Sequence, residues 1–72
     1  EIPVVDIKEE QLGILDLLVK AGLAPSKSEA QRLIIQKGVK INSETQEDWR
    51  KIIKIQKDMV VQAGRRKFIK IR

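Results

Sequence analysis

Two segments in the first half of the chain space their apolar residues as helices do. From about Gln11 to Ala21 the apolar side chains form a broad stripe, and Gly22 stands where a helix usually ends. A second apolar stripe lies between Pro25 and Gly38. We therefore predict two short helices that are joined by a tight corner.

The start of the second helix carries a local signal. Ser26 precedes Glu29 by three residues, which is the spacing of a capping box. In this arrangement the Ser26 hydroxyl accepts from the Glu29 amide, and the Glu29 carboxylate accepts from the Ser26 amide. Pro25 disfavours helix before this point, and Gly38 is expected to end the helix at about Lys37.

After Gly38 the apolar residues alternate with polar ones, as in half-buried strands. Strand-like segments cover residues 39–42, 51–55, 59–62 and 65–71, although 51–55 also suits a helical turn. We expect the polar, acidic stretch 43–48 to be a loop and residues 4–7 to be an extended lead-in. The pattern predicts an α+β fold, with the helix pair packed on one face of a small, mostly antiparallel β-sheet.

Composition excludes several kinds of chemistry. The 72 residues suffice for one domain, and no apolar run approaches the roughly 18–20 residues that span a bilayer. The absence of cysteine and histidine excludes disulfides, thiolate or histidine-ligated metal sites, and histidine catalysis. We expect a non-catalytic, cytoplasmic domain without cofactor or metal. Because the chain begins at Glu1 and not at Met, we expect it to be a fragment of a longer protein.

Charge is distributed unevenly along the chain. Residues 1–36 carry four Lys/Arg and six Asp/Glu, whereas residues 37–72 carry eleven and four, so the balances are −2 and +7 and sum to the net +5. A one-sided basic surface favours a polyanionic partner through steering and counterion release. The alternative is a lysine-rich face that is merely solvated.

Polar side chains that suit RNA gather between Ser26 and Asn42. Lysine and arginine neutralise phosphate, while glutamine, asparagine and serine donate to backbone oxygens and to the ribose hydroxyl. Helical spacing places several of these side chains on adjacent stripes of the second helix. An ordinary amphipathic helix with a wet face is the competing interpretation. The candidate RNA-binding residues here are Lys27, Ser28, Gln31, Arg32, Lys37, Lys40 and Asn42.

The C-terminal segment is basic without interruption by an acid. Arg65, Arg66 and Lys67 can follow phosphates, or can keep an exposed edge soluble. Phe68 could stack on an unpaired base, but we expect it to pack under the helices or at the sheet edge. Trp49 lies among acidic residues, and we expect it to cover hydrophobic core.

Residues 25–28 partly match the ATP-binding Lys-Met-Ser-Lys-Ser loop of one synthetase class. The leading Lys and Met are replaced by Ala24 and Pro25, and a His-Ile-Gly-His partner is impossible without histidine. The capping box already explains these residues, so we do not assign an ATP site.

The stretches Ser26–Ile34 and Lys37–Asn42 resemble the alpha-L RNA-binding motif. That motif occurs in a ribosomal small-subunit protein, in pseudouridine synthases, in a ribosome-recycling heat-shock protein and in bacterial tyrosyl-tRNA synthetases. The flanking segments 2–4, 14–19 and 64–68 are similar to the C-terminal domain of the tyrosyl-tRNA synthetases. The resemblance therefore spans nearly the whole chain.

This resemblance implies contacts with the elbow side and long variable arm of tRNA-Tyr. It also implies that the parent protein is a homodimeric, ATP-dependent tyrosine-tRNA ligase. The fragment by itself is expected to be a monomer. Two departures change the expectations: the usual Asn-Gly turn is Asn42-Ser43, which argues against a tight type I′ turn, and acidic residues 44–48 argue against RNA contact there.

Two alternatives stay open. The first is a ribosomal-RNA or ribosome-associated binder with the same motif, although Ile14 replaces the arginine that usually opens the first helix in those relatives. The second is a protein-interaction module with a basic face.

Overall fold

The domain is organised around a five-stranded sheet. The computed structural model describes residues 2–72. All neighbouring strands are antiparallel except β1 and β7, which run parallel with Val4 opposite Lys70. The predicted α+β class with a mostly antiparallel sheet is thus confirmed. In spatial order the strands are β1 (Val4–Val5), β7 (Lys67–Ile71), β6 (Val60–Ala63), β3 (Val39–Ile41) and β4 (Glu44–Thr45).

Alternation along the strands divides the sheet into a buried and an open face. In β3, Val39 and Ile41 are buried while Lys40 is exposed, as the pattern predicts. In β7, Ile69 is buried and Phe68 faces the other way, half-buried and opposite Gln62 of β6. Phe68 therefore does not pack under the helices, which lie on the other face. Because β1 pairs with β7 only at Lys70 and Ile71, the alternative that Phe68 packs at the sheet edge stays a prediction.

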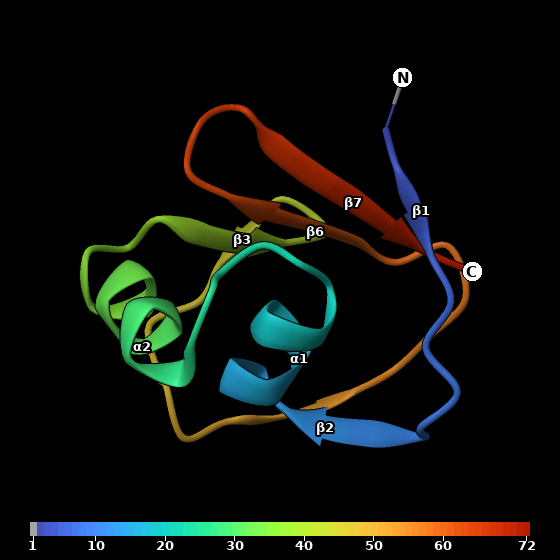
Figure 1. Cartoon of the computed structure of the whole chain (residues 1–72), viewed down its shortest axis with the longest axis horizontal. Helices are drawn as coiled ribbons and strands as arrows, with labels where there is room; N and C mark the ends of the chain where they lie inside the picture. Colours follow the sequence, from blue (N-terminus) through green and yellow to red (C-terminus); the bar gives the residue numbers. More distant parts are fainter. Residues whose placement is uncertain (1) are drawn as a thin grey trace.

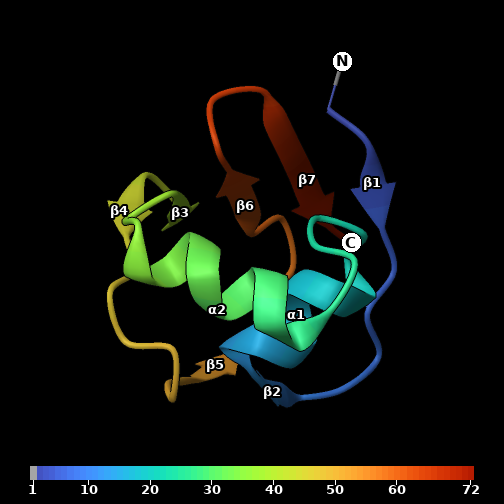
Figure 2. The same cartoon turned by 60° about the vertical axis from the view of Figure 1, so that its left-hand side comes forward.

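Two helices cover the buried face, as Figures 1 and 2 show. Helix α1 (Ile14–Lys20) buries Ile14, Leu17 and Leu18, and helix α2 (Lys27–Ile35) buries Ala30 and Ile34. Neither helix among the described residues is long and apolar enough to cross a membrane.

Helix α1 ends at Lys20, and Gly22 lies just beyond its C-cap with a φ of 77°, which is reached most easily without a Cβ atom. The Leu23 amide donates to the Leu18 carbonyl at 2.9 Å, and the Gly22 amide donates to the Val19 carbonyl at 3.1 Å. This pair of bonds is the Schellman motif, and it turns the chain toward α2.

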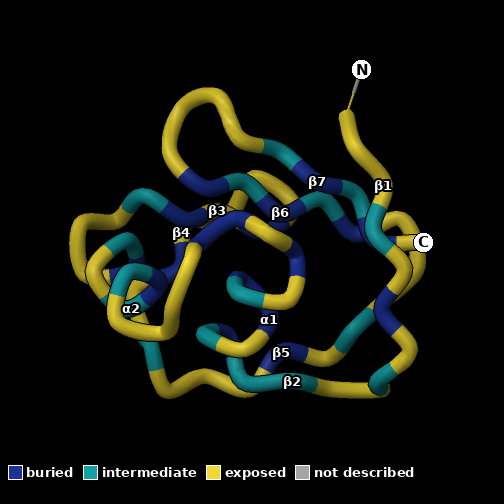
Figure 3. Tube along the Cα trace, in the orientation of Figure 1, coloured by how far each residue is buried: buried dark blue, intermediate teal, exposed yellow. Residues whose placement is uncertain are grey.

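The expected helix from about Gln11 is wrong over its first three residues. They form strand β2 (Gln11–Gly13), which pairs antiparallel with β5 (Ile52–Lys54) in a separate two-stranded sheet. This pairing confirms 51–55 as strand and not as a helical turn. Helix α1 therefore lies between the two sheets, and Figure 3 shows the buried positions that line this space. The side chains of Leu12 and Ile53 face each other across the ribbon and pack on the core.

The segment after β3 also differs from the expected loop. Asn42 and Ser43 have φ values of 50° and 71°, and Ile41 pairs with Glu44 across them. Positive φ at both central residues is the signature of a type I′ turn, so the expectation against a tight turn is wrong. Asparagine tolerates this conformation, and its Oδ1 accepts a 3.0 Å hydrogen bond from the Val60 amide, which extends the sheet.

Candidate nucleic-acid interface

Ser26 fixes where helix α2 begins. The Ser26 Oγ accepts from the Glu29 amide at 3.3 Å, so half of the predicted capping box is formed. The Glu29 carboxylate lies toward Arg32, with its Oε1 3.8 Å from the Arg32 Nη1. The cap accounts for Ser26, consistent with leaving the ATP-loop interpretation aside.

Helix α2 presents most of the predicted RNA-binding residues on its exposed side. Lys27, Ser28 and Arg32 are exposed, and Gln31 is half-buried. They share this side because the buried Ala30 and Ile34 fix the opposite stripe against the core. The structure thus brings these four side chains together on one helix surface, as helical spacing predicts.

Three predicted cations are paired with carboxylates from three different segments. Each pair is exposed to solvent, so water and salt screen it strongly. The pairs are Lys27 Nζ–Asp16 Oδ1 at 2.9 Å, Arg32 Nη1–Glu29 Oε1 at 3.8 Å, and Lys37 Nζ–Glu47 Oε1 at 3.5 Å. An incoming phosphate would have to compete with these carboxylates.

Lys37 follows α2 in a left-handed conformation with φ of 60°. The Lys37 amide donates to the Ile34 carbonyl at 2.9 Å and the Gly38 amide donates to the Leu33 carbonyl at 2.8 Å. This second Schellman motif is closed by a lysine where glycine is usual. The helix end therefore holds the backbone of Lys37 in place while its side chain stays exposed.

The polar face of β3 does not continue the polar face of α2. Lys40 lies on the open face of the sheet, between Gln62 of β6 and Thr45 of β4. Asn42 uses its Oδ1 to bind the Val60 amide within the sheet. Lys40 and Asn42 are thus separated from the surface of α2, whereas the sequence suggested that they could join it.

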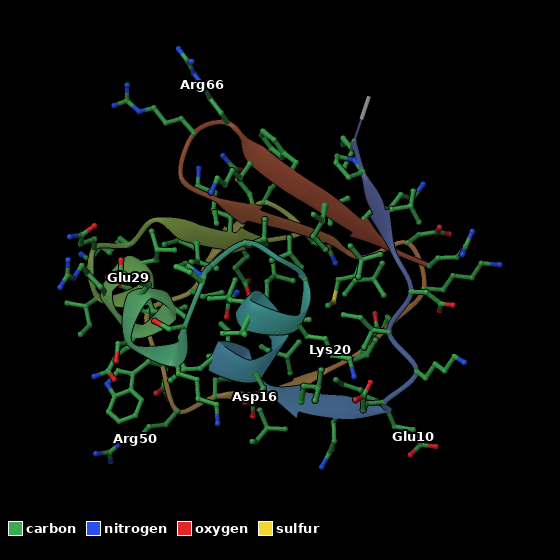
Figure 4. All side chains as sticks on the ribbon, in the orientation of Figure 1. Glu10, Asp16, Lys20, Glu29, Arg50 and Arg66 are labelled. Carbon is green, nitrogen blue, oxygen red and sulfur yellow. The ribbon has the colours of Figure 1, made fainter. Side chains whose placement is uncertain are left out.

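The basic turn between β6 and β7 lies close to α2 instead. Arg65, Arg66 and Lys67 are exposed, and within residues 2–72 they form no ion pair. Figure 4 shows Arg66 pointing away from the body of the domain. The turn and α2 are the two walls of a groove of about 490 Å³. The sequence identified the second helix and the basic segment 65–67 separately, but did not indicate that they lie side by side.

This groove, called the α2–turn groove below, has an apolar floor and a charged rim. Its floor and walls combine aliphatic side chains, one carboxylate and the three cations of the turn. The lining residues are Leu23, Pro25, Glu29, Leu33, Ala63, Gly64, Arg65, Arg66 and Lys67.

The aromatic and acidic residues elsewhere have structural roles. Trp49 is half-buried and packs against the core, as expected, and the Arg50 guanidinium lies 4.8 Å from the centre of its ring.

A hydrogen bond from Lys20 lowers the pKa of Glu9, and this pair lies on the helix α1 side of the domain. Among residues 2–72, no three acidic side chains are grouped so that they could hold a metal ion.

Fold and surface together define a small α+β domain that carries a preformed basic groove. The chain belongs to the SYY-like C-terminal domain family of tyrosine–tRNA ligase, whose family model matches residues 1–71. The predicted resemblance to the C-terminal domain of bacterial tyrosyl-tRNA synthetases is thus confirmed.

Curated relatives agree with this assignment. The chain is 44% identical over 71 residues to a tyrosine–tRNA ligase of Moorella thermoacetica, with 99% of this chain and 17% of that protein covered. The corresponding enzyme of Thermotoga maritima is 46% identical and that of Aquifex aeolicus 38% identical, each with 99% of this chain and 18% of the relative covered. The chain therefore spans less than a fifth of the length of these relatives.

Proposed function

We propose that this domain is a non-catalytic tRNA-binding module of a tyrosyl-tRNA synthetase, and that it grips the elbow side and long variable arm of tRNA-Tyr. The α2–turn groove is the observation that carries the proposal. Membership of the family and the names of the relatives support tRNA as the partner. The tyrosine-activating chemistry, which uses ATP, is assigned to the catalytic part of the parent ligase.

The groove fits an RNA backbone because its two walls offer different contacts. The turn presents unpaired guanidinium and ammonium groups at Arg65, Arg66 and Lys67. The α2 wall itself consists of Glu29 and Leu33, and Ser28 and Arg32 lie on the exposed surface of the helix, where they can donate to phosphate and ribose oxygens. A phosphate backbone that follows the turn and continues over the exposed surface of α2 would meet donors from both elements.

Recognition would depend mainly on shape. A-form RNA hides its base edges in a deep, narrow major groove, while its ribose hydroxyls and phosphates stay accessible. The long variable arm changes where these phosphates lie relative to the elbow of the tRNA. A rigid surface formed by α2 and the β6–β7 turn could distinguish this arrangement from that of a tRNA without the arm.

The groove also ranks the predicted contact residues. Arg65–Lys67 line the groove and rank first in our proposal, and Lys27, Gln31 and Arg32 follow, because they lie on the α2 surface outside it. Lys37 adds a cation at the end of α2. Lys40, on the open face of the sheet, and Asn42, in the turn after β3, would contact RNA only where it extends beyond the surface of α2.

A titration tests the proposal directly. Wild-type domain is titrated with tRNA-Tyr, with the same tRNA lacking the long arm, and with a ribosomal RNA fragment, at two salt concentrations. The variants are Lys27→Ala/Arg32→Ala/Lys40→Ala and Arg65→Ala/Arg66→Ala/Lys67→Ala. Lys8→Ala/Lys54→Ala/Lys57→Ala is the matched control, because it removes the same charge from exposed positions outside the groove.

We expect tRNA-Tyr to bind most tightly and both triple variants to weaken binding more than the control does. Each lost phosphate contact should reduce the salt slope by about one. Equal affinity for all three RNAs would refute the specificity for tRNA-Tyr and leave a general RNA binder. Absence of binding at low salt would refute the RNA proposal and favour a protein-interaction module.

A further inference from the structure

The α2–turn groove contains a feature that phosphate binding does not explain. Glu29 lines it, although a carboxylate facing a polyanion is unfavourable by itself. Its side chain is 46% exposed, and its Oε1 lies 3.8 Å from Arg32, beyond hydrogen-bond range. The carboxylate of this groove-lining residue therefore keeps free acceptor capacity.

Beside this carboxylate the groove is apolar. Leu23 and Ala63 are buried and Leu33 packs against the core, so the floor is formed by well-packed aliphatic groups. Flat nucleobases can lie against such a floor, whereas phosphates cannot use it. The volume of about 490 Å³ falls in the range of roughly 300–1,000 Å³ that is typical of small-molecule sites.

The wall opposite Glu29 is held in place by backbone hydrogen bonds. The Gly64 amide donates to the Gly38 carbonyl at 2.7 Å, which ties the turn to the segment that follows α2. The Gln62 Nε2 donates to the Gly64 carbonyl at 2.9 Å. The groove is thus formed before any ligand arrives, which lowers the ordering cost of binding.

We infer that the α2–turn groove holds one unpaired guanine nucleotide of the bound RNA. The base lies on the aliphatic floor, its Watson–Crick edge donates to Glu29, and Arg65 and Arg66 bind the flanking phosphates. This inference rests on the proposed function, because it names the part of the RNA that enters this site.

Guanine matches the single carboxylate better than the other bases do. Its Watson–Crick edge carries two adjacent donors, N1–H and the N2 amino group, which can reach both oxygens of one carboxylate. Adenine and cytosine offer one amino donor beside a ring-nitrogen acceptor, and uracil offers one imino donor between two carbonyl groups. Only a nucleotide splayed out of a helix can present this edge, because pairing occupies it in a duplex.

Short RNA hairpins test the inference. Five hairpins share one stem: four carry a single bulged G, A, C or U, and one is fully paired. Each is titrated with wild-type domain, with Glu29→Gln, and with the control Glu47→Gln, which makes the same charge change at an ion-paired carboxylate outside the groove. Glutamine suits position 29 in the capping box, and a thermal melt of each variant checks that it is folded.

We expect wild-type domain to bind the G bulge about tenfold more tightly than the U bulge, as for a good bidentate contact. Glu29→Gln should remove this preference, and Glu47→Gln should retain it. Salt-dependent binding that is equal for all five hairpins would overturn the guanine site while leaving RNA binding intact. If neither the hairpins nor tRNA-Tyr bind at low salt, the proposed function itself fails.

Discussion

The ion pair between Lys27 and Asp16 should restrain RNA binding, and Asp16→Asn should release that restraint. In the free domain Lys27 Nζ lies 2.9 Å from Asp16 Oδ1, so a phosphate must displace this carboxylate before it can use the lysine. The substitution keeps the size of the side chain and removes its charge. Lys27 is then free before the RNA arrives.

The size of the effect follows from the exposure of the pair. The two side chains are 68% and 49% exposed, which places the pair among surface ion pairs that contribute about 0.2–1 kcal/mol. Recovering this free energy on binding corresponds to a gain in affinity of about 1.4- to 5-fold. Asp16 also lies in the first turn of α1, so its loss should lower the free energy of unfolding by about 0.3–1 kcal/mol. Affinity and stability should therefore change in opposite directions.

Fluorescence anisotropy with labelled tRNA-Tyr measures the affinity. The gain should shrink between about 50 mM and 200 mM salt, because exposed charges are increasingly screened. Glu10→Gln is the control: it changes the net charge equally, and Glu10 lies on the far side of the domain from Glu29 and α2 (Figure 4). The reasoning is refuted if Asp16→Asn binds no more tightly than wild type, or if Glu10→Gln gains as much.

Three further predictions concern stability. Ser26→Ala removes the cap of α2 and should lower the free energy of unfolding by about 1 kcal/mol in urea titrations, while Ser28→Ala, at an exposed position of the same helix, should have a smaller effect. Ser43→Gly should raise the free energy of unfolding by about 0.5–1 kcal/mol, because glycine adopts the φ of 71° more readily than serine does. A loss of stability would contradict this reasoning. The hydrogen bond from Lys20 lowers the pKa of Glu9 below its ordinary 4.5, so this contribution is present at neutral pH and is lost as pH falls through the folded-state value. Unfolding of Glu9→Gln followed by circular dichroism should depend less on pH below about 4.5, and an unchanged acid limb would argue against the Glu9–Lys20 contact.

Local patterns predicted the elements whose own residues determine them. Alternation in residues 39–41 gave β3, and the Ser26–Glu29 spacing gave the start of α2. Strand β2 was not predicted because Gln11–Gly13 also fits a helical stripe. Its strand conformation depends on pairing with Ile52–Lys54, which are distant in the sequence. Strand β4 was missed for a similar reason: two exposed polar residues show no alternation, and the turn before them decides their conformation.

The candidate site was predictable in its charges but not in its shape. The sequence identified the cations of α2 and of the β6–β7 turn, which were two unrelated basic segments until the fold was known. The groove depends on contacts such as the hydrogen bond from the Gly64 amide to the Gly38 carbonyl, which no local sequence pattern predicts. The sequence assigned Glu29 only to the capping box of α2. Its place in the lining of the groove became visible only in the fold.

The parallel pairing of β1 with β7 has a consequence for synthesis of the domain. Val4 is opposite Lys70, so the first strand of this domain needs a partner made 66 residues later. At translation rates of about 5–20 residues per second, β1 waits for roughly 3–13 s before the sheet can close. Pro3 directly precedes this strand and has no amide proton to offer a competing chain. The Pro3 carbonyl accepts from the Lys70 amide at 2.9 Å, so β1 can join the sheet only after nearly the whole domain has been synthesised.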